Sequence, residues 1–329
     1  GIGAASGYFT LDRWLIATGS SAGRLTMTQT ADGPSGFANC LKLDCTTADT
    51  SIAAAENLVL QQRFEGQDLQ QIKKGTSDAE LITFSFYVKA NAAFTFGVEL
   101  FDADNTRQIT KLFDTTTGWV KHELTFPADT TGAFTDDNAL SLTLGFWIHA
   151  GSTFTSGTLN TAAWASSTNA NRAAGIDSFY SSTDNEFFLT GVQMEIGSQA
   201  TNFEHRSFGE EMLLCQRYFF IGCSSTDAHT GGMANGSFRT TSNAQVLQQH
   251  PVAMRANPTA TLRASGSVVI HDTNDGNNIN VTAIDAVVNQ SVKSTLFGLT
   301  LASASGVVGE GCWTYSATST PGITFDAEL

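Results

Sequence analysis

Three side chains, Trp147, His149 and Trp164, are candidates for binding carbohydrate. Trp147 and His149 alternate with aliphatic and aromatic residues along LSLTLGFWIHA (140–150), so they share the strand face opposite to the expected core face. Trp164 follows in the long polar stretch 151–186. A pyranose has an apolar face and a rim of hydroxyl groups, which aromatic rings with polar neighbours recognise. The alternative interpretation is that Trp147 packs beneath this stretch and Trp164 anchors it.

The sequence predicts no catalytic residue. A G-x-S-x-G match surrounds Ser21, but a strand pattern follows it instead of the helix that a nucleophile elbow needs. Two carboxylate pairs, Asp136 with Asp137 and Asp184 with Glu186, have the residue types for glycoside hydrolysis. Both pairs lie in turn-like polar segments, where acids are common. We therefore predict that the protein is not an enzyme, and we keep a polysaccharide depolymerase as an alternative.

Metal-binding spacing is also missing from the sequence. No two of the six His residues are two or four positions apart, and no Cys-x-x-Cys motif occurs, so we predict no metal site. The segment DTNDGNN (272–278) has the composition of a calcium loop without the spacing of an EF-hand. We expect no cofactor, with calcium kept as an open alternative.

The charge balance and the apolar runs narrow the choice of partners. The chain has 17 basic and 31 acidic residues and a formal net charge of −14, which repels phosphate backbones and argues against nucleic acid. No stretch of 18 consecutive apolar residues occurs, so we predict no membrane span. The five cysteines are dispersed and odd in number, which does not indicate a disulfide framework.

Short apolar runs separated by Ser, Thr, Gly and Asn predict an all-β protein. In LITFSFYVKA (81–90), Ile82, Phe84, Phe86 and Val88 share one face, which is a clear period of two. We predict, in chain order, an antiparallel two-sheet sandwich over residues 1–203, a short linking helix over 204–222 and a smaller C-terminal β-domain, a knob or oligomerisation domain, over 223–329.

The linking helix is predicted from a capping box and an apolar stripe. Ser207 is followed by Glu210 three residues later. The stripe has spacings of four, three and four and contains Phe208, Met212, Cys215 and Phe219. A helix this short is marginal alone, so we expect another domain or subunit to bury the stripe. Ion pairs of Arg206 and Arg217 are expected across that boundary, and a solvated charged face is the alternative.

Several motifs in combination resemble tail-fibre and virion-appendage proteins of tailed phages. The motifs are FFLTGVQMEIG (187–197), ATNFEHRS (200–207), EEMLLCQRYF (210–219), GYFTLDRW (7–14) and HPVAMRANPTATL (250–262). The resemblance implies a carbohydrate-binding-like jelly roll followed by a small β-domain. It also implies a homotrimer located in the virion, assembled in the host cytoplasm, that contacts other virion proteins and in some cases host-surface glycan.

The function that we expect from these observations is host attachment by a non-enzymatic virion protein. Several weak glycan contacts would act together in an assembly of several copies. Two rivals remain. One is an architectural decoration protein of capsid or tail, which would bind no glycan, and the other is the depolymerase, which would need two close carboxylates in a groove.

Overall fold

The computed structural model describes residues 2–8, 13–222, 232–317 and 322–329. The chain forms two compact units, the first comprising Gly1–His205 with Leu329 and the second comprising Arg206–Glu328. The predicted linking helix belongs to the second unit. No helix in the described ranges combines the length and the apolar character that a membrane crossing requires.

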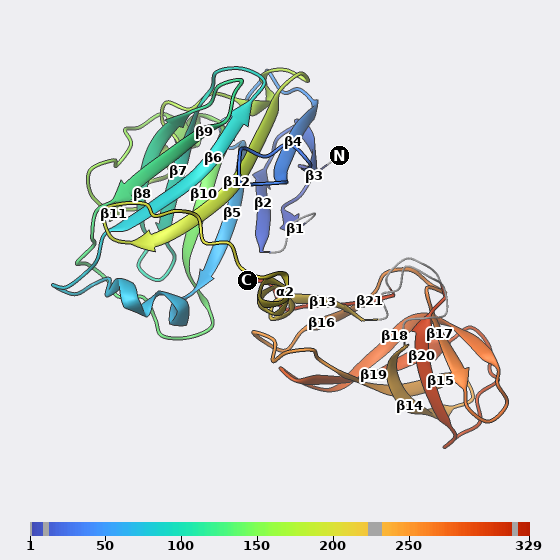
Figure 1. Ribbon diagram of the computed structural model, residues 1–329. Helices are drawn as coiled ribbons and strands as arrows, with labels where there is room; N and C mark the ends of the chain where they lie inside the picture. The colour runs from blue at the N-terminus through green and yellow to red at the C-terminus, as the bar shows by residue number, and fades with distance from the viewer. Residues whose placement is uncertain (1, 9–12, 223–231, 318–321) are drawn as a thin grey trace. The chain divides into compact units, whose positions relative to one another are not determined.

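The first unit is a sandwich of two antiparallel sheets (Figure 1). The seven-stranded sheet consists, in spatial order, of β1 (Gly7–Tyr8), β2 (Trp14–Gly19), β5 (Asn57–Glu65), β10 (Leu140–Ala150), β7 (Thr95–Asp102), β8 (Arg107–Asp114) and β11 (Ala165–Ser166). The five-stranded sheet consists of β3 (Arg24–Thr30), β4 (Cys40–Thr47), β12 (Glu186–Ile196), β6 (Ile82–Ala90) and β9 (Val120–Phe126). A 3-10 helix, η1 (Gly66–Ile72), follows β5.

The core of the sandwich lies between the two sheets and follows the alternation in the sequence. In β6 the side chains of Ile82, Phe84, Phe86 and Val88 are all buried in this core. The intervening Tyr87 is only half-buried, because alternate residues of a strand face opposite sides of the sheet. The predicted period of two in β6 is therefore confirmed.

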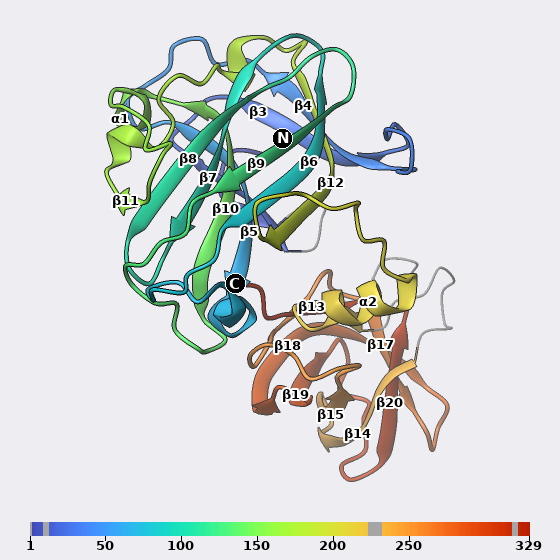
Figure 2. The ribbon, with the colours of Figure 1, turned by 60° about the vertical axis from the view of Figure 1, so that its left-hand side comes forward.

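The long stretch 151–186 packs against the outer face of the seven-stranded sheet. It contains α1 (Ser152–Thr155), β11, η2 (Asn169–Asn171) and η3 (Phe179–Ser181). Figure 2 shows α1 and β11 beside β8, with which β11 pairs. Side chains of this stretch form a small apolar cluster with Val59 and Trp147. As a result β10 is buried on both faces along most of its length.

The second unit begins with α2 (Phe208–Gln216) and contains two β-structures. A three-stranded sheet consists of β13 (Phe219–Gly222), β21 (Ile323–Asp326) and β16 (Thr259–Leu262). A closed six-stranded barrel consists of β14 (Gly232–Thr240), β15 (Asn243–Gln249), β19 (Ser294–Leu301), β18 (Asn278–Ser291), β17 (Val268–Asp272) and β20 (Gly311–Ser316). The predicted fold class, an antiparallel jelly-roll sandwich followed by a short helix and a smaller β-region, is confirmed.

The segment TATLRASGSVVIHD (259–272) reads as one extended run in the sequence, but it folds into two strands, β16 and β17, separated by a turn. The Ser267 N–H donates to the Ala264 carbonyl at 3.1 Å, and Gly266 has a φ of +78°. Glycine takes this left-handed conformation at little cost, so the turn redirects the chain from the three-stranded sheet into the barrel.

Candidate functional site

Trp147 lies beneath the stretch 151–186 and not at the surface. Its side chain is 2% exposed, and its indole Nε1 donates a hydrogen bond of 2.8 Å to Glu99 Oε2. Arg172 also donates two hydrogen bonds, of 2.8 and 2.7 Å, to the Glu99 carboxylate, and its guanidinium lies 4.9 Å from the centre of the Trp147 ring. Trp147 is therefore not on an exposed strand face, and the alternative interpretation, in which it packs beneath this stretch, is confirmed, because an ion pair formed with the covering stretch closes this face.

His149 and Trp164 are buried as well and have separate polar partners. The His149 ring lies 2.7 Å from Ser178 Oγ through Nδ1 and 3.2 Å from Glu56 Oε2 through Nε2, and burial lowers the pKa of His149. The Trp164 indole donates a 2.9 Å hydrogen bond to the Pro127 carbonyl. Trp147, His149 and Trp164 therefore do not form an exposed platform, and a sugar ring in solution cannot stack on them.

Half-buried aromatic side chains occur instead on the outer face of the five-stranded sheet. Three strands place Lys42, Phe188 and Lys89 in one row, because Lys42 pairs with Phe188 and Phe188 pairs with Lys89. Tyr87 lies two residues before Lys89 on the same face of β6, and Trp119 directly precedes β9. These five residues are called the aromatic face below.

The rings of the aromatic face have different degrees of access. Phe188 is 6% exposed, and the Lys89 Nζ lies 4.4 Å from the centre of its ring. Lys89 is also 5.4 Å from the centre of the Trp119 ring, and Lys42 is 5.8 Å from that of Phe188. Tyr87 and Trp119 are only half-buried. Phe188 thus supports the two ammonium groups, whereas Tyr87 and Trp119 retain exposed surface for a ligand.

Carboxylates hold both lysines of the aromatic face in place. The Lys42 Nζ lies 2.5 Å from Glu186 Oε1 and 3.4 Å from Asp44 Oδ1, and the hydrogen bond with Glu186 raises the pKa of Lys42. Lys89 pairs with Asp32, and its hydrogen bond holds the pKa of the Asp32 carboxyl below the ordinary value. These ion pairs hold hydrogen-bond donors and acceptors in fixed positions beside the rings.

A β-bulge in β12 allows a second aromatic group to extend this surface. The Phe37 ring lies 5.4 Å from that of Tyr87 and 5.0 Å from that of Phe203, measured between ring centres. Gly191, in the bulge, has a φ of +60°, and a Cβ there would lie 2.7 Å from Phe37 Cζ. Glycine is therefore needed at this position for the Phe37 ring to reach Tyr87.

The other end of the same sheet face is covered by the chain that follows β12. Thr83 Oγ1 donates a hydrogen bond of 2.7 Å to the Gly197 carbonyl, and the Glu204 N–H donates one of 2.8 Å to Gln193 Oε1. Thr83 is buried although it faces outward from the core. The open part of the face is thus restricted to the neighbourhood of Tyr87 and Trp119.

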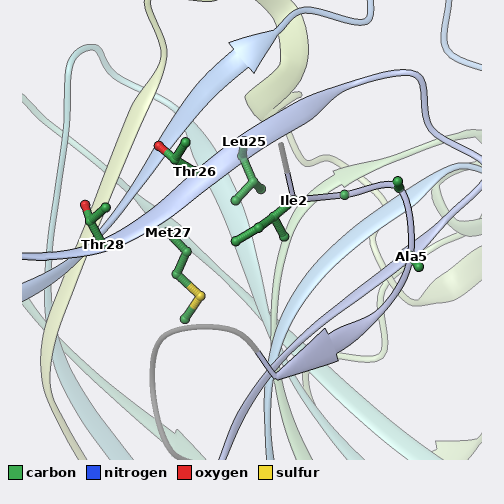
Figure 3. A pocket seen from close by; sticks show the side chains of 8 residues that line it. Ile2, Ala5, Leu25, Thr26, Met27 and Thr28 are labelled. Atoms are coloured by element: carbon green, nitrogen blue, oxygen red, sulfur yellow. The ribbon is translucent and has the colours of Figure 1, made fainter. Parts of the chain in front are cut away.

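A pocket of about 540 Å³ next to β3 has a different chemical character (Figure 3). Ile2, Leu25 and Met27 point into it, while Thr26 and Thr28 point to the other side of the strand. Its described lining residues are aliphatic, small or threonine, without an aromatic ring or a charged group. Such a lining offers little to orient a polar ligand such as a sugar.

The predicted helix is present, with its predicted cap, as α2. Ser207 Oγ accepts a hydrogen bond from the Glu210 N–H, and the Glu210 carboxylate accepts one from the Ser207 N–H, so the capping box is confirmed. No residue of α2 is buried, and Phe208 is 81% exposed, followed along the stripe by the exposed Met212. The predicted burial of this stripe is thus not found among the described residues, which leave its apolar side chains exposed.

The remaining predicted contact residues flank or end the same helix. Cys215 and Phe219 are half-buried. Arg206 pairs with Glu211 at 3.2 Å within the segment, and the Arg217 carbonyl accepts a hydrogen bond of 2.8 Å from the Arg255 N–H. The Arg206 ion pair is therefore local. An interface of these residues with another copy or another protein stays a prediction.

Sequence reasoning missed Tyr87, Trp119 and their lysines, although a signal for two of them was present. Tyr87 and Lys89 occupy the polar side of the clearest alternating strand, and an aromatic residue on a polar strand face is unusual. Trp119 directly precedes β9 and is half-buried. Trp147 and Trp164 lie beneath and within the long stretch 151–186, and both rings are buried there.

Comparisons with known proteins find structural likeness only. No protein-family model matches the sequence, and no curated protein matches it. A CBM4 structure matches at a TM-score of 0.32 with 10% identity, covering 56% of this chain and 87% of the other. A family 11 carbohydrate-binding module from Clostridium thermocellum, in complex with a mixed-linked tetrasaccharide, matches at 0.30 with 10% identity, covering 56% and 89%. The enzymatically active domain of tailspike protein 4 of bacteriophage CBA120 matches at 0.31 with 10% identity, covering 56% and 19%.

Proposed function

We propose that this protein is a non-enzymatic virion protein of a tailed phage that binds host-surface glycan through its aromatic face. The observation that carries the proposal is the pairing of two half-buried rings, Tyr87 and Trp119, with ion-paired Lys42 and Lys89 on an open sheet face. The virion assignment rests on the sequence motifs that resemble those of tail-fibre and appendage proteins.

Each part of the aromatic face has a role in the proposed binding. The apolar face of a pyranose stacks on Tyr87 or Trp119, and its hydroxyl groups exchange hydrogen bonds with the ammonium and carboxylate groups beside them. Water competes for these hydrogen bonds, so a single site binds weakly. A homotrimer would raise the effective affinity by presenting three sites to one surface.

Two of the four acids with the residue types for hydrolysis already have partners in the structure. Glu186 is held by Lys42 at 2.5 Å and Asp137 Oδ1 accepts a hydrogen bond of 2.8 Å from the Ala139 N–H, so each already has a structural partner. A polysaccharide depolymerase is therefore the weaker proposal for this chain. Its test is the release of reducing ends from the same glycans.

A glycan array with the purified chain, followed by calorimetry on the glycans that bind, tests the proposal. Trp119→Ala and Tyr87→Ala are each expected to weaken single-site binding at least about fivefold, which corresponds to roughly 1 kcal/mol of lost stacking. Leu112→Ala is the matched control, since Leu112 is exposed on a strand of the other sheet. Binding that both aromatic variants retain would place the site elsewhere, and an array without any binding would favour the architectural decoration protein.

A further inference from the structure

The turn between β17 and β18 brings a carboxylate to the end of the barrel core. Asp272 ends β17, two residues after Ile270, which is buried in that core. Alternate residues of a strand face the same way, so Asp272 also faces inward, and it is 0% exposed. Its partner on β20 is Cys312, which lies in the same core, and burial together with Asp272 raises the pKa of Cys312 to about 11.

Only one oxygen of Asp272 has a hydrogen-bond partner. Oδ1 accepts hydrogen bonds from the N–H groups of Asn274 and Asp275, at 2.9 and 3.4 Å. Oδ2 is completely buried and has no hydrogen-bond partner among the residues that the structure describes. An ionised oxygen removed from water without compensation is strongly unfavourable, so buried carboxylates are normally paired with a cation or coordinate a metal.

Glu310 contributes a second oxygen of this kind to the same turn. The Asn274 side chain donates a hydrogen bond of 3.0 Å to Glu310 Oε1 and so connects the two acids. Glu310 Oε2 is buried and, within the described ranges, has no hydrogen-bond partner. Loss of hydration, followed by the negative charges of Asp272 and Asp275, raises the pKa of Glu310. The two carboxylates therefore stand close enough to repel each other.

Within the described part of the chain, these acids have no counter-charge in an ion pair. The ion pairs between described residues involve neither Asp272 nor Glu310 nor Asp275. Elsewhere in the same chain buried acids do have such partners, as Glu99 has Arg172. Asp272 and Glu310 thus lack, among the described residues, the kind of cationic partner that Glu99 has in Arg172.

We propose that the β17–β18 turn binds Ca²⁺ between the Asp272 and Glu310 carboxylates. Calcium accepts carboxylate, carbonyl and water oxygens in flexible geometry, whereas Mg²⁺ requires near-octahedral geometry and gives up its water reluctantly. The turn offers the two unpartnered carboxylate oxygens and the carbonyls of a short loop. In the described part of the chain no three His, Cys, Asp or Glu side chains form a ready-made metal site, so water completes the coordination. With two charged ligands the expected Kd is about 10⁻⁴ to 10⁻³ M.

Thermal unfolding of the full chain at pH 7, in EGTA and in CaCl₂ up to 10 mM, tests the proposal. Calcium that binds only the folded barrel is expected to raise its Tm by about 2–5 °C at the highest concentration. Glu310→Gln is expected to abolish the shift, and it should fold because Glu310 is only partly buried. Asp285→Asn is the matched control, an exposed acid on β18 that should leave the shift intact.

Terbium luminescence gives a direct reading of occupancy at this turn. Trp313 is adjacent to Cys312 on β20 and pairs with His271, so it can sensitise Tb³⁺ bound near Asp272. Bound Tb³⁺ is expected to emit, and calcium should displace it and so remove the emission. Trp313→Phe should abolish the emission, and Glu310→Gln should lower the affinity for Tb³⁺ at least about tenfold. A calcium-induced Tm shift that persists in Glu310→Gln would overturn the proposal. Stabilisation of the barrel by acid and not by calcium would also overturn it, since a proton would then satisfy the two oxygens.

Discussion

His250 is a buried titratable residue whose two ring nitrogens both have partners. Its Nδ1 lies 3.0 Å from the Val292 carbonyl, and its Nε2 lies 2.9 Å from Thr295 Oγ1. Nδ1 therefore donates to the carbonyl, and in the neutral ring Nε2 accepts from the hydroxyl. The ring also packs 5.4 Å from that of Phe220, between ring centres, and burial lowers the pKa of His250.

The second unit is expected to lose stability as the pH falls through about 6.5, the ordinary pKa of histidine. Below that value the unfolded chain takes up a proton that folded His250 does not, so unfolding becomes more favourable until the lowered folded pKa is reached. Urea unfolding of wild type and His250→Gln between pH 8 and 5 measures this loss of stability, with the variant showing the shallower pH dependence. Parallel curves for the two proteins would contradict the prediction.

At the scale of the element, the bulge in β12 determines the shape of the candidate glycan surface. Thr190 pairs with Tyr87 and Gln193 pairs with Ser85, so three steps along β12 match only two along β6 and the register shifts. Gly191 lies in this shift and makes room for the Phe37 ring against Tyr87. The bulge thereby connects a local backbone conformation to the arrangement of the rings.

Gly191→Ala is expected to destabilise the first unit by about 1–3 kcal/mol, which combines the cost of a left-handed alanine with the displacement of Phe37. Weaker glycan binding should accompany it, because Tyr87 loses its neighbouring ring. Gly118→Ala is the control, since a Cβ at Gly118 would meet nothing within 4 Å. Equal urea midpoints for the two variants would show that the bulge tolerates a side chain.

At the scale of the whole molecule, exposed apolar residues of α2 favour assembly. Phe208, Met212, Leu213 and Leu214 are all exposed on a nine-residue helix. A helix of this length gains most of its stability from packing, and cyclic symmetry would give each copy the same contact. This is the surface that we propose for the homotrimer.

Light scattering at a protein concentration of tens of micromolar is expected to give a mass of about 105 kDa, three times the 34.9 kDa of the chain. The double variant Phe208→Ser with Leu213→Ser should yield the monomer, because it removes apolar surface from the proposed interface. Its Tm at low concentration should match that of wild type, which controls for folding. A wild-type monomer under these conditions would count against the trimer.

Local sequence signals account for the parts of the fold that were predicted. The alternation of β6 and the Ser207–Glu210 capping box each involve residues only a few positions apart, so the sequence is sufficient to indicate them. The closure of the barrel was not predictable, because it joins β14 to β20 across most of the second unit. The same holds for Lys74, whose ammonium lies 2.5 Å from Asp102 and 3.0 Å from Asp129, both remote in sequence.

The sequence by itself determined which residues share a strand face, because side chains alternate along any extended chain. It placed Trp147 with His149, and Tyr87 with Lys89, on the outward faces of their sheets. Only the tertiary structure decided which of these faces remains open. Arg172 pairs with Glu99 and thereby holds the stretch 151–186 over Trp147, whereas Tyr87 and Trp119 on the other sheet stay half-buried. That choice depends on contacts between residues far apart in the chain, which no local pattern records.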